Sequence, residues 1–147
     1  MKKIMMTLAL ALTLSSMYAF TGEEAVNKHA LAAFKSEFNS AKDVDWTVAK
    51  DYYRVNFTMN DQKLFAYYTM NGEFMAVSRY ISSFQMPLNL QTNLKKSFSK
   101  YWITDLFELA NQDGTSYYVT LETADTRLVL KSTDGNNWTL YQKTQKA

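Results

Sequence analysis

Residues that could carry out nucleophilic chemistry are few in this chain and lie far apart. The chain has one histidine, His29, and no cysteine. A serine nucleophile needs a base within hydrogen-bond reach, and the sequence contains no G-x-S-x-G elbow that would present one. Its four glycines form no phosphate-binding loop. These features argue against nucleophilic catalysis and against phosphoryl transfer.

Carboxylates are the remaining candidates for catalysis. Two carboxylic acids at a suitable separation can hydrolyse a glycosidic bond, one as the general acid and the other as nucleophile or base. Most candidates fall in predicted turns, which favour acidic residues for backbone reasons alone. They are Asp61, Glu73, Asp113, Asp125 and Asp134. We therefore expect a protein that is not an enzyme, although folding could bring two carboxylates together.

Metal ligands are also scarce. Structural zinc needs about four Cys or His ligands, and His29 is predicted to lie beside the apolar stripe of a helix, at the boundary or on the surface. No D-x-D-x-D-G calcium loop is present, and Asp43 and Asp45 fall at the start of a predicted strand. We expect no metal and no cofactor.

The first residues, "MKKIMMTLALALTLSSMYAF", have the pattern of a secretory signal peptide. Lys2 and Lys3 precede an apolar run from Ile4 to Leu14, and small residues follow. The run is about half of the roughly 20 apolar residues that a membrane span needs. We predict cleavage of residues 1–19 after Ala19, with Ser16 as the alternative, and a periplasmic or secreted protein without a membrane span.

The charge balance argues against nucleic acid as a partner. The chain has 16 basic and 14 acidic residues, and loss of Lys2 and Lys3 would make the numbers equal. A protein that binds phosphate backbones needs a basic field. Without cysteine, stability must come from a packed core, and the aromatic content of 15% supplies large side chains for it.

The first half reads as a helix followed by four strands. Thr21 and Glu24 have the spacing of a capping box, and a helix of about four turns is predicted from apolar residues at spacing four. These are Val26, Ala30, Phe34 and Phe38. Alternating apolar residues then predict strands. Their ranges are Val44–Val48, Tyr53–Met59, Leu64–Met70 and Phe74–Arg79.

The second half repeats this order. Pro87 is predicted to begin a helix in which Leu90, Leu94 and Phe98 again lie four residues apart. Four more strands follow, over Ile103–Ala110, Ser116–Thr123, Thr126–Ser132 and Asn137–Lys143. The predicted fold is therefore α+β, a tandem repeat of a helix followed by a four-stranded antiparallel sheet. The repeats would span residues 20–82 and 83–147, docked as one folding unit.

Turns and strand matches support a duplication. Asn71-Gly72 and Asp134-Gly135 are predicted type I′ hairpin turns. The alignment matches Val44 with Ile103, and Tyr53, Val55 and Phe57 with Tyr117, Val119 and Leu121. The third strand is ambiguous, because a shift of one residue exchanges its faces. The preferred match pairs Phe65 and Tyr67 with Leu128 and Leu130; the alternative buries Leu64 and Ala66.

Four segments carry a family resemblance: "AAFKSEFNSAKDVDW", "YYRVNF", "AYYTMNGEF" and "MPLNLQTNLKKSF". Together with their spacing, they resemble the PepSY-like, beta-lactamase-inhibitor-like secreted proteins of Bacteroidetes-type bacteria. That family doubles a helix-plus-sheet unit and often carries the segment matched here by Asp43 to Trp46. The chain departs from it at Thr21-Gly22, where the family has a proline, and in its second half, which has no tryptophan at the position that matches Trp46. The resemblance implies a periplasmic or secreted binding protein, with enzyme inhibition by analogy and no catalytic residues.

Alternation along the second strand of each half separates its two faces. Tyr53 and Tyr117 should contact the helices. Trp46, which alternates with Val44 and Val48, should be buried against Phe34 and Phe38. The other face holds the candidate binding residues, which are Tyr52, Arg54, Tyr118, Thr120 and Glu122. Tyr and Arg are enriched among the residues that dominate protein interfaces. The alternative is that this face of one half packs on the other half.

These observations favour an exported, non-enzymatic protein that binds another protein through this aromatic face. The resemblance implies, by analogy, that it inhibits a protease or other enzyme. The second hypothesis is a carrier of a small molecule or peptide. Its cleft would lie between helix and sheet and be lined by Tyr67, Tyr68 and Phe74. An apolar pocket with a polar mouth would favour the carrier.

Overall fold

The computed structural model describes residues 20–147, which form a nine-stranded antiparallel sheet and two α-helices. Each strand pairs with the next one along the chain. The strands are β1 (Phe20–Thr21), β2 (Lys42–Val48), β3 (Tyr52–Met59), β4 (Gln62–Thr69), β5 (Phe74–Tyr80), β6 (Trp102–Asn111), β7 (Gly114–Glu122), β8 (Thr126–Ser132) and β9 (Thr139–Gln145). The helices are α1 (Lys28–Glu37) and α2 (Leu88–Ser97). The predicted signal peptide and its cleavage site lie outside the described residues.

The α+β class is confirmed, but the two predicted four-stranded sheets are one continuous sheet. β5 and β6 pair with each other from Val77 opposite Ala110 to Tyr80 opposite Phe107. This pairing gives hydrogen-bond partners to the two strands that would otherwise be sheet edges. The order of a helix and then four long strands still occurs twice along the chain.

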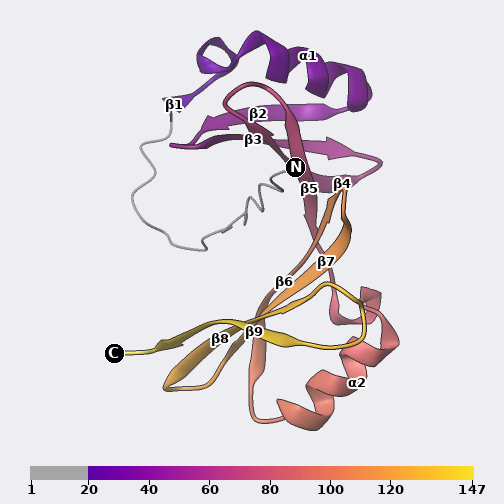
Figure 1. Cartoon of the computed structure of the whole chain (residues 1–147), viewed down its shortest axis with the longest axis vertical. Coiled ribbons are helices and arrows are strands. Elements are labelled where there is room, and N and C mark those ends of the chain that lie inside the picture. The colour runs from indigo at the N-terminus through magenta and orange to yellow at the C-terminus, as the bar shows by residue number, and fades with distance from the viewer. Residues whose placement is uncertain (1–19) are drawn as a thin grey trace, which may run out of the picture.

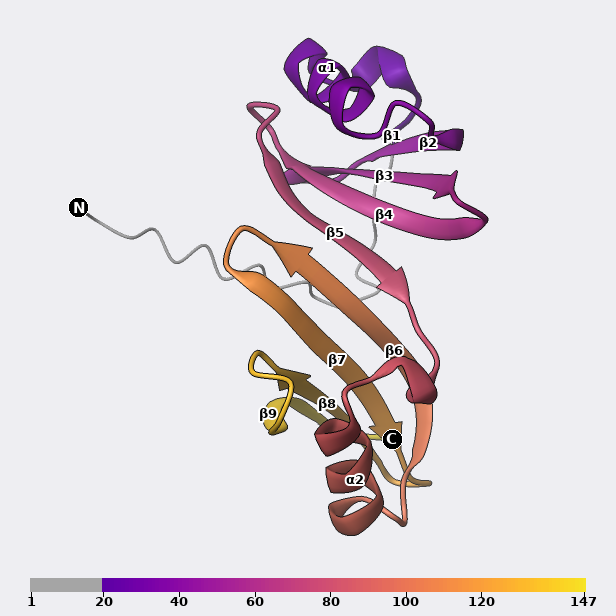
Figure 2. The same ribbon diagram turned by 90° about the vertical axis from the view of Figure 1, so that its right-hand side faces the viewer.

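Both helices cover the same face of this sheet. Val55 lies opposite Ala66, Ala66 lies opposite Val77, and Val77 lies opposite Ala110, so all four residues share a face. Leu106 has the same parity as Ala110 and belongs to the core under α2. Figures 1 and 2 show α1 and α2 at opposite ends of the elongated molecule. The other face, which no helix covers, is called the open face below.

The first helix begins later than predicted. Thr21 belongs to β1, and a short 3-10 turn, η1 (Glu23–Ala25), precedes the helix. The side chain of Asn27 caps α1 by accepting a hydrogen bond from the backbone N–H of His29 at 2.8 Å. The predicted capping box at Thr21 is therefore wrong. The apolar stripe of the helix is confirmed, because Ala30 and Phe34 are buried against the sheet.

The second helix follows the prediction more closely. Another 3-10 turn, η2 (Ser83–Gln85), leads into it, and the Gln85 side chain accepts a hydrogen bond from the Ser82 N–H at 2.8 Å. Pro87 is the residue immediately before the first helical residue rather than that residue itself. Its missing N–H costs nothing there, because the first N–H groups of a helix have no partner inside the helix. Leu90 and Leu94 are buried as predicted.

The predicted type I′ turns are wrong, since Gly72 and Gly135 are the only residues of their turns with positive φ. The residues with two consecutive positive φ values are Asn60 and Asp61, which connect Met59 and Gln62 as a two-residue hairpin turn. Gly72 has a different role. A Cβ at this position would lie 2.6 Å from the backbone nitrogen of Ala30, so the turn can touch α1 only through glycine.

The preferred register of the third strand is also wrong. Ala66 lies opposite Val55 and is buried under α1 together with Tyr68, whereas Phe65 and Tyr67 lie on the open face. The alternative register, with Leu64 and Ala66 on the helix side, is the observed one.

A β-bulge near the start of the first long strand of each half explains why a second predicted match between the halves is shifted. Trp46 lies opposite Val55 and Leu106 lies opposite Val119, so Trp46 and Leu106 correspond. The register shifts between Lys42 and Asp45 in β2 and between Ile103 and Asp105 in β6. The predicted match of Val44 with Ile103 is therefore wrong by one residue.

Candidate functional site on the open face of the sheet

The open face carries an apolar cluster of its own, although no helix covers it. We call it the open-face cluster. Its buried members are Tyr67, Ala76, Phe107, Leu109, Tyr118 and Val129, and Tyr52, Phe65, Met75 and Tyr141 pack around them. These residues come from both halves and meet across the β5–β6 pairing. The join between the halves is therefore also the middle of the open face.

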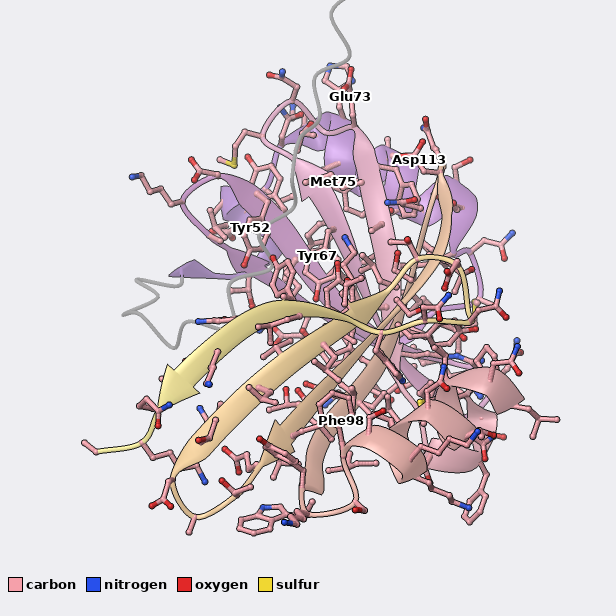
Figure 3. All side chains as sticks on the ribbon, turned by 60° about the horizontal axis from the view of Figure 1, so that its bottom comes forward. Tyr52, Tyr67, Glu73, Met75, Phe98 and Asp113 are labelled. Atoms are coloured by element: carbon pink, nitrogen blue, oxygen red, sulfur yellow. The ribbon has the colours of Figure 1, made fainter. Side chains whose placement is uncertain are left out.

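Aromatic contacts hold this cluster together. The rings of Phe107 and Tyr118 are stacked, with centroids 4.8 Å apart, and Tyr141 meets Tyr118 edge to face at 5.6 Å. Tyr52 and Tyr67 lie 5.9 Å apart on neighbouring strands. Figure 3 shows these two tyrosines side by side, on the side of β3 and β4 that turns toward β8 and β9. Such pairs add to the stability that burial alone provides.

The five candidate binding residues share the open face but differ in exposure. Tyr52 and Arg54 are half-buried. Tyr118, Thr120 and Glu122 are buried, each with less than a tenth of its surface exposed. The expectation that Tyr118 points to water is wrong, because its ring is held between Phe107 and Tyr141. Contact of these five residues with a partner stays a prediction.

Glu122 already has partners within the chain. Its carboxylate forms ion pairs with Arg127 of β8 and with Lys146. The hydrogen bond from Arg127 holds the pKa of Glu122 below its ordinary value, and the nearby charge of Lys146 acts in the same direction. Glu122 therefore ties β7 to its neighbours, and Tyr52 and Arg54 are the candidates with more freedom to meet a partner.

Three ionisable groups on the open face have raised pKa values, and burial is the main cause in each. They are Tyr67, Tyr80 and Asp105. The hydroxyl of Tyr67 is in contact with that of Ser78 at 3.5 Å. Tyr80 keeps 62% of its surface exposed. Both tyrosines thus stay neutral, and Tyr80 is the one that is exposed to a partner.

The cleft that the carrier hypothesis predicts, lined by Tyr67, Tyr68 and Phe74, is not formed. Tyr67 and Tyr68 are neighbours on β4 and point to opposite faces of the sheet. Tyr68 is fully buried beneath α1, where its ring contacts those of Trp46 and Phe74. The three predicted lining residues therefore cannot surround one ligand.

Sequence reasoning missed the contribution of β6 and the end of β5 to the site. Phe107 and Leu109 are buried in the open-face cluster, and Tyr80 contacts Phe65 edge to face at 5.7 Å. A signal was present, since Leu106 and Phe107 are consecutive apolar residues. Such a pair indicates a strand that is buried on both faces.

Two further observations concern the described part of the chain, residues 20–147. It contains no group of three or more His, Cys, Asp or Glu side chains that could hold a metal ion. Neither of its α-helices is long and apolar enough to cross a membrane.

The fold resembles that of several solved structures from Bacteroides. One is a BLIP-like protein from Bacteroides fragilis, with a TM-score of 0.69 and 17% identity, over 82% of this chain and 86% of that one. Another is a DUF2874 family protein from Bacteroides uniformis, with a TM-score of 0.72 and 14% identity, over 82% and 89%. A third, from Bacteroides eggerthii, is named by its expected periplasmic location, with a TM-score of 0.70 and 13% identity, over 82% and 88%.

These likenesses establish a shared fold, and at such low identity they establish the fold alone. No family model matches the chain, and no curated protein sequence matches it. Fold and site define an α+β protein with two helices on one face of a continuous antiparallel sheet, a fold that this chain shares with these Bacteroides structures.

Proposed function

We propose that this protein is exported and, without being an enzyme, binds another protein through the open face of its sheet, with inhibition of an enzyme as the consequence. The observation that carries the proposal is the open-face cluster. One face of a large sheet has no helix over it, yet aromatic side chains and Arg54 gather there. Aromatic residues and arginine are the types most enriched among anchors of protein interfaces.

The proposed location is the periplasm or the extracellular space. The signal-peptide pattern of residues 1–19 supports it, as does the fold shared with a protein from Bacteroides eggerthii that is named by an expected periplasmic location. The inhibitory activity rests on the beta-lactamase-inhibitor-like resemblance and on the BLIP-like structure from Bacteroides fragilis.

A PepSY-like tandem repeat is the proposed origin of the fold. Each half has a helix and four strands in the same order, and each has a bulge near the start of its first long strand. Val55 and Val119 occupy corresponding positions in the two halves. Duplication of one unit, followed by pairing of β5 with β6, accounts for these shared features.

The direct test is capture of a partner from a periplasmic extract by the immobilised protein, compared between variants. The double variant Tyr52→Ser and Tyr80→Ser changes two rings of the open face. Phe84→Ser is the matched control, because Phe84 is 86% exposed and lies in η2, outside the open-face cluster.

We expect the double variant to lose partner capture and Phe84→Ser to retain it, with both variants folded by circular dichroism. Removal of an interface anchor typically weakens binding by about 2 kcal/mol or more. Capture that survives the double variant but is lost with Phe84→Ser would place the interface elsewhere.

A further inference from the structure

One arginine on the open face has no carboxylate partner. Arg79 pairs with Glu108 at 3.0 Å, and Arg127 pairs with Glu122. No carboxylate of residues 20–147 lies within ion-pair distance of the remaining arginine, Arg54. Arginine is placed in part-buried positions where its planar fork can bind an anion or stack on a ring.

The surroundings of Arg54 provide the ring but not the anion. Its guanidinium carbon lies 5.8 Å from the centre of the Phe65 ring, on the neighbouring strand. Its Nε atom is buried and has no hydrogen-bond acceptor. A buried donor without an acceptor costs free energy, and the cost is greater when the donor is charged. The folded chain alone therefore leaves the Nε atom of Arg54 without an acceptor.

A second polar group without a partner lies beside it. Asn56 is the next residue of β3 on the open face, and its Oδ1 atom is buried with no hydrogen-bond donor. Exchange of the oxygen and nitrogen positions of this amide would turn its NH2 group to the same spot. Arg54 and Asn56 are thus neighbouring open-face residues of β3, each with a buried polar atom that lacks a partner.

The neighbouring aromatic residues make this spot suitable for a charged hydrogen bond. Tyr52 and Tyr67 are in contact, as are Phe65 and Tyr80, and these four rings come from strands β3 to β5 around Arg54. Burial raises the pKa of both Tyr67 and Tyr80, and the positive charge of Arg54, which lies opposite Tyr67, acts on each in the other direction. A low-dielectric setting strengthens a hydrogen bond between charged groups.

We propose that Arg54 binds a carboxylate of the partner: the partner presents an aspartate or glutamate side chain that accepts hydrogen bonds from Arg54 and Asn56. Charge complementarity selects this occupant, because an acidic side chain supplies the one kind of group that Arg54 lacks and that the other two arginines possess. A carboxylate also matches the two-pronged geometry of guanidinium. The inference rests on the proposed function and adds the chemistry of the partner to it.

The test uses the folded chain from Phe20 to Ala147 and a phage-displayed library of random peptides as the probe. Peptides are selected against the wild-type protein and then measured against Arg54→Gln, Tyr80→Ala and Lys35→Gln. Lys35→Gln removes the same charge from an exposed residue of α1, on the other side of the sheet. Arg54→Lys keeps the charge but removes the fork.

We expect the selected peptides to be enriched in Asp and Glu, to bind Arg54→Gln about tenfold or more weakly, and to bind Lys35→Gln normally. Arg54→Lys should lie between wild type and Arg54→Gln. Circular dichroism checks that Arg54→Gln melts like the wild type, as loss of an unpaired group should allow.

Two other results would overturn the inference, and they are distinguishable. In the first, the peptides depend on Tyr80 but have no acidic enrichment or bind Arg54→Gln normally. This result would rule out a carboxylate at Arg54 but keep the open face as the interface. In the second, the selection gives no binder, or only peptides whose affinity is unchanged by Tyr80→Ala and Arg54→Gln. This result would contradict both the inference and the proposed function.

Discussion

The two halves of the molecule have the same order of elements but fill their cores with different side chains. Beneath α1 the buried residues are mainly aromatic, with Phe34 and Trp46 in contact edge to face at 5.4 Å. Beneath α2 they are mainly leucines, among them Leu94 and Leu106. The arrangement of helix and strands therefore does not depend on one kind of core residue.

Compensating differences in side-chain volume explain how both sets of core residues fit the same arrangement of helix and strands. Val55 lies between Trp46 and Ala66 on neighbouring strands, so the largest side chain is close to one of the smallest. The corresponding valine of the second half lies between Leu106 and Leu130, two residues of middle size. Cores tolerate such exchanges when the total volume and the apolar pattern are kept. The comparison teaches that each half conserves volume rather than residue type.

The largest effect is expected when the halves are separated. A fragment of residues 20–82 exposes the free edge of β5, and a fragment of 83–147 exposes that of β6. Both lose part of the open-face cluster, and about 60 residues without disulfides form a marginal core. We expect neither fragment to fold. Thermal unfolding followed by circular dichroism decides this, and a cooperative transition in either fragment would show that the halves are independent.

Truncation of corresponding core residues comes next. Trp46 is 1% exposed and Leu106 is 5% exposed. Trp46→Ala should lower the free energy of unfolding by about 3–5 kcal/mol, and Leu106→Ala by about 2–5 kcal/mol. We expect the larger loss at Trp46, because truncation of the larger side chain leaves the larger cavity. Denaturant titrations measure both values. A smaller loss at Trp46 would contradict the volume argument.

The β4–β5 turn and the β8–β9 turn each contact the start of a helix, but they do so in different ways. Gly72 has a φ of 88° and no room for a Cβ, whereas a Cβ on Gly135, at φ 71°, would meet Pro87 at 3.6 Å. Gly72→Ala should therefore cost about 3 kcal/mol or more, from backbone strain and displacement of α1 together. Gly135→Ala should cost about 1 kcal/mol, from strain alone.

Melting temperatures of the two alanine variants give the comparison directly. The turn after β8 is held by hydrogen bonds instead of close packing, since Asn93 donates to the carbonyl of Asn136 at 2.7 Å and Trp138 donates to that of Leu90 at 3.1 Å. Equal losses at Gly72 and Gly135 would mean that the close approach to Ala30 has no energetic weight.

The sequence allowed prediction of features that depend on local spacing. The stripes of both helices could be predicted because residues four apart share a face of any helix. The register of β4 could not, because it is buried on both faces: Phe65 and Tyr67 are as apolar as Leu64 and Tyr68. Alternation marks a face only where the other face is polar.

The candidate site was predicted in part for the same reason. Parity correctly placed Tyr52, Arg54 and Tyr118 away from the helices. It could not reveal the burial of Tyr118, because alternation gives the face on which a residue lies but not the rings that cover it there, which are those of Phe107 and Tyr141. Nor could it reveal the pairing of β5 with β6, which no local pattern specifies.

Acid should weaken the turn of the second half selectively. The carboxylate of Asp134 accepts hydrogen bonds from the backbone N–H groups of Asn137 and Asn136, and these hold its pKa well below the ordinary value of 3.8. A lowered folded-state pKa gives stability that is present above the ordinary pKa and is lost as the pH falls below it. The corresponding residue of the first half, Asn71, does not titrate.

The measurement compares melting temperatures of the wild type and of Asp134→Asn from pH 7 to pH 2. We expect the variant to be less stable at pH 7, with the difference shrinking below about pH 4 as the wild-type carboxylate becomes protonated. Asp113→Asn is the control, because its carboxylate accepts no hydrogen bond in residues 20–147. A difference that stays constant with pH would contradict the assignment to Asp134.

The smallest effect is expected at a pair of corresponding hydroxyls. Tyr68 lies opposite Tyr53 and Ser132 lies opposite Tyr117, so the two residues occupy the same place in the two halves. The hydroxyl of Tyr68 is buried without a partner, and burial, with a smaller effect from the charge of Glu37, raises its pKa. The hydroxyl of Ser132 accepts a hydrogen bond from the N–H of Gly135 at 3.1 Å.

Tyr68→Phe should therefore leave stability unchanged or raise it by up to about 1 kcal/mol, because it removes a polar group that is buried without a partner. Ser132→Ala should lower stability by about 1–3 kcal/mol, because it leaves the N–H of Gly135 without its acceptor. Both substitutions remove a single oxygen atom, so denaturant titrations compare a used hydroxyl with an unused one at the same position of the fold. A loss at Tyr68 equal to that at Ser132 would show that the tyrosine hydroxyl has a partner after all, most simply a buried water molecule.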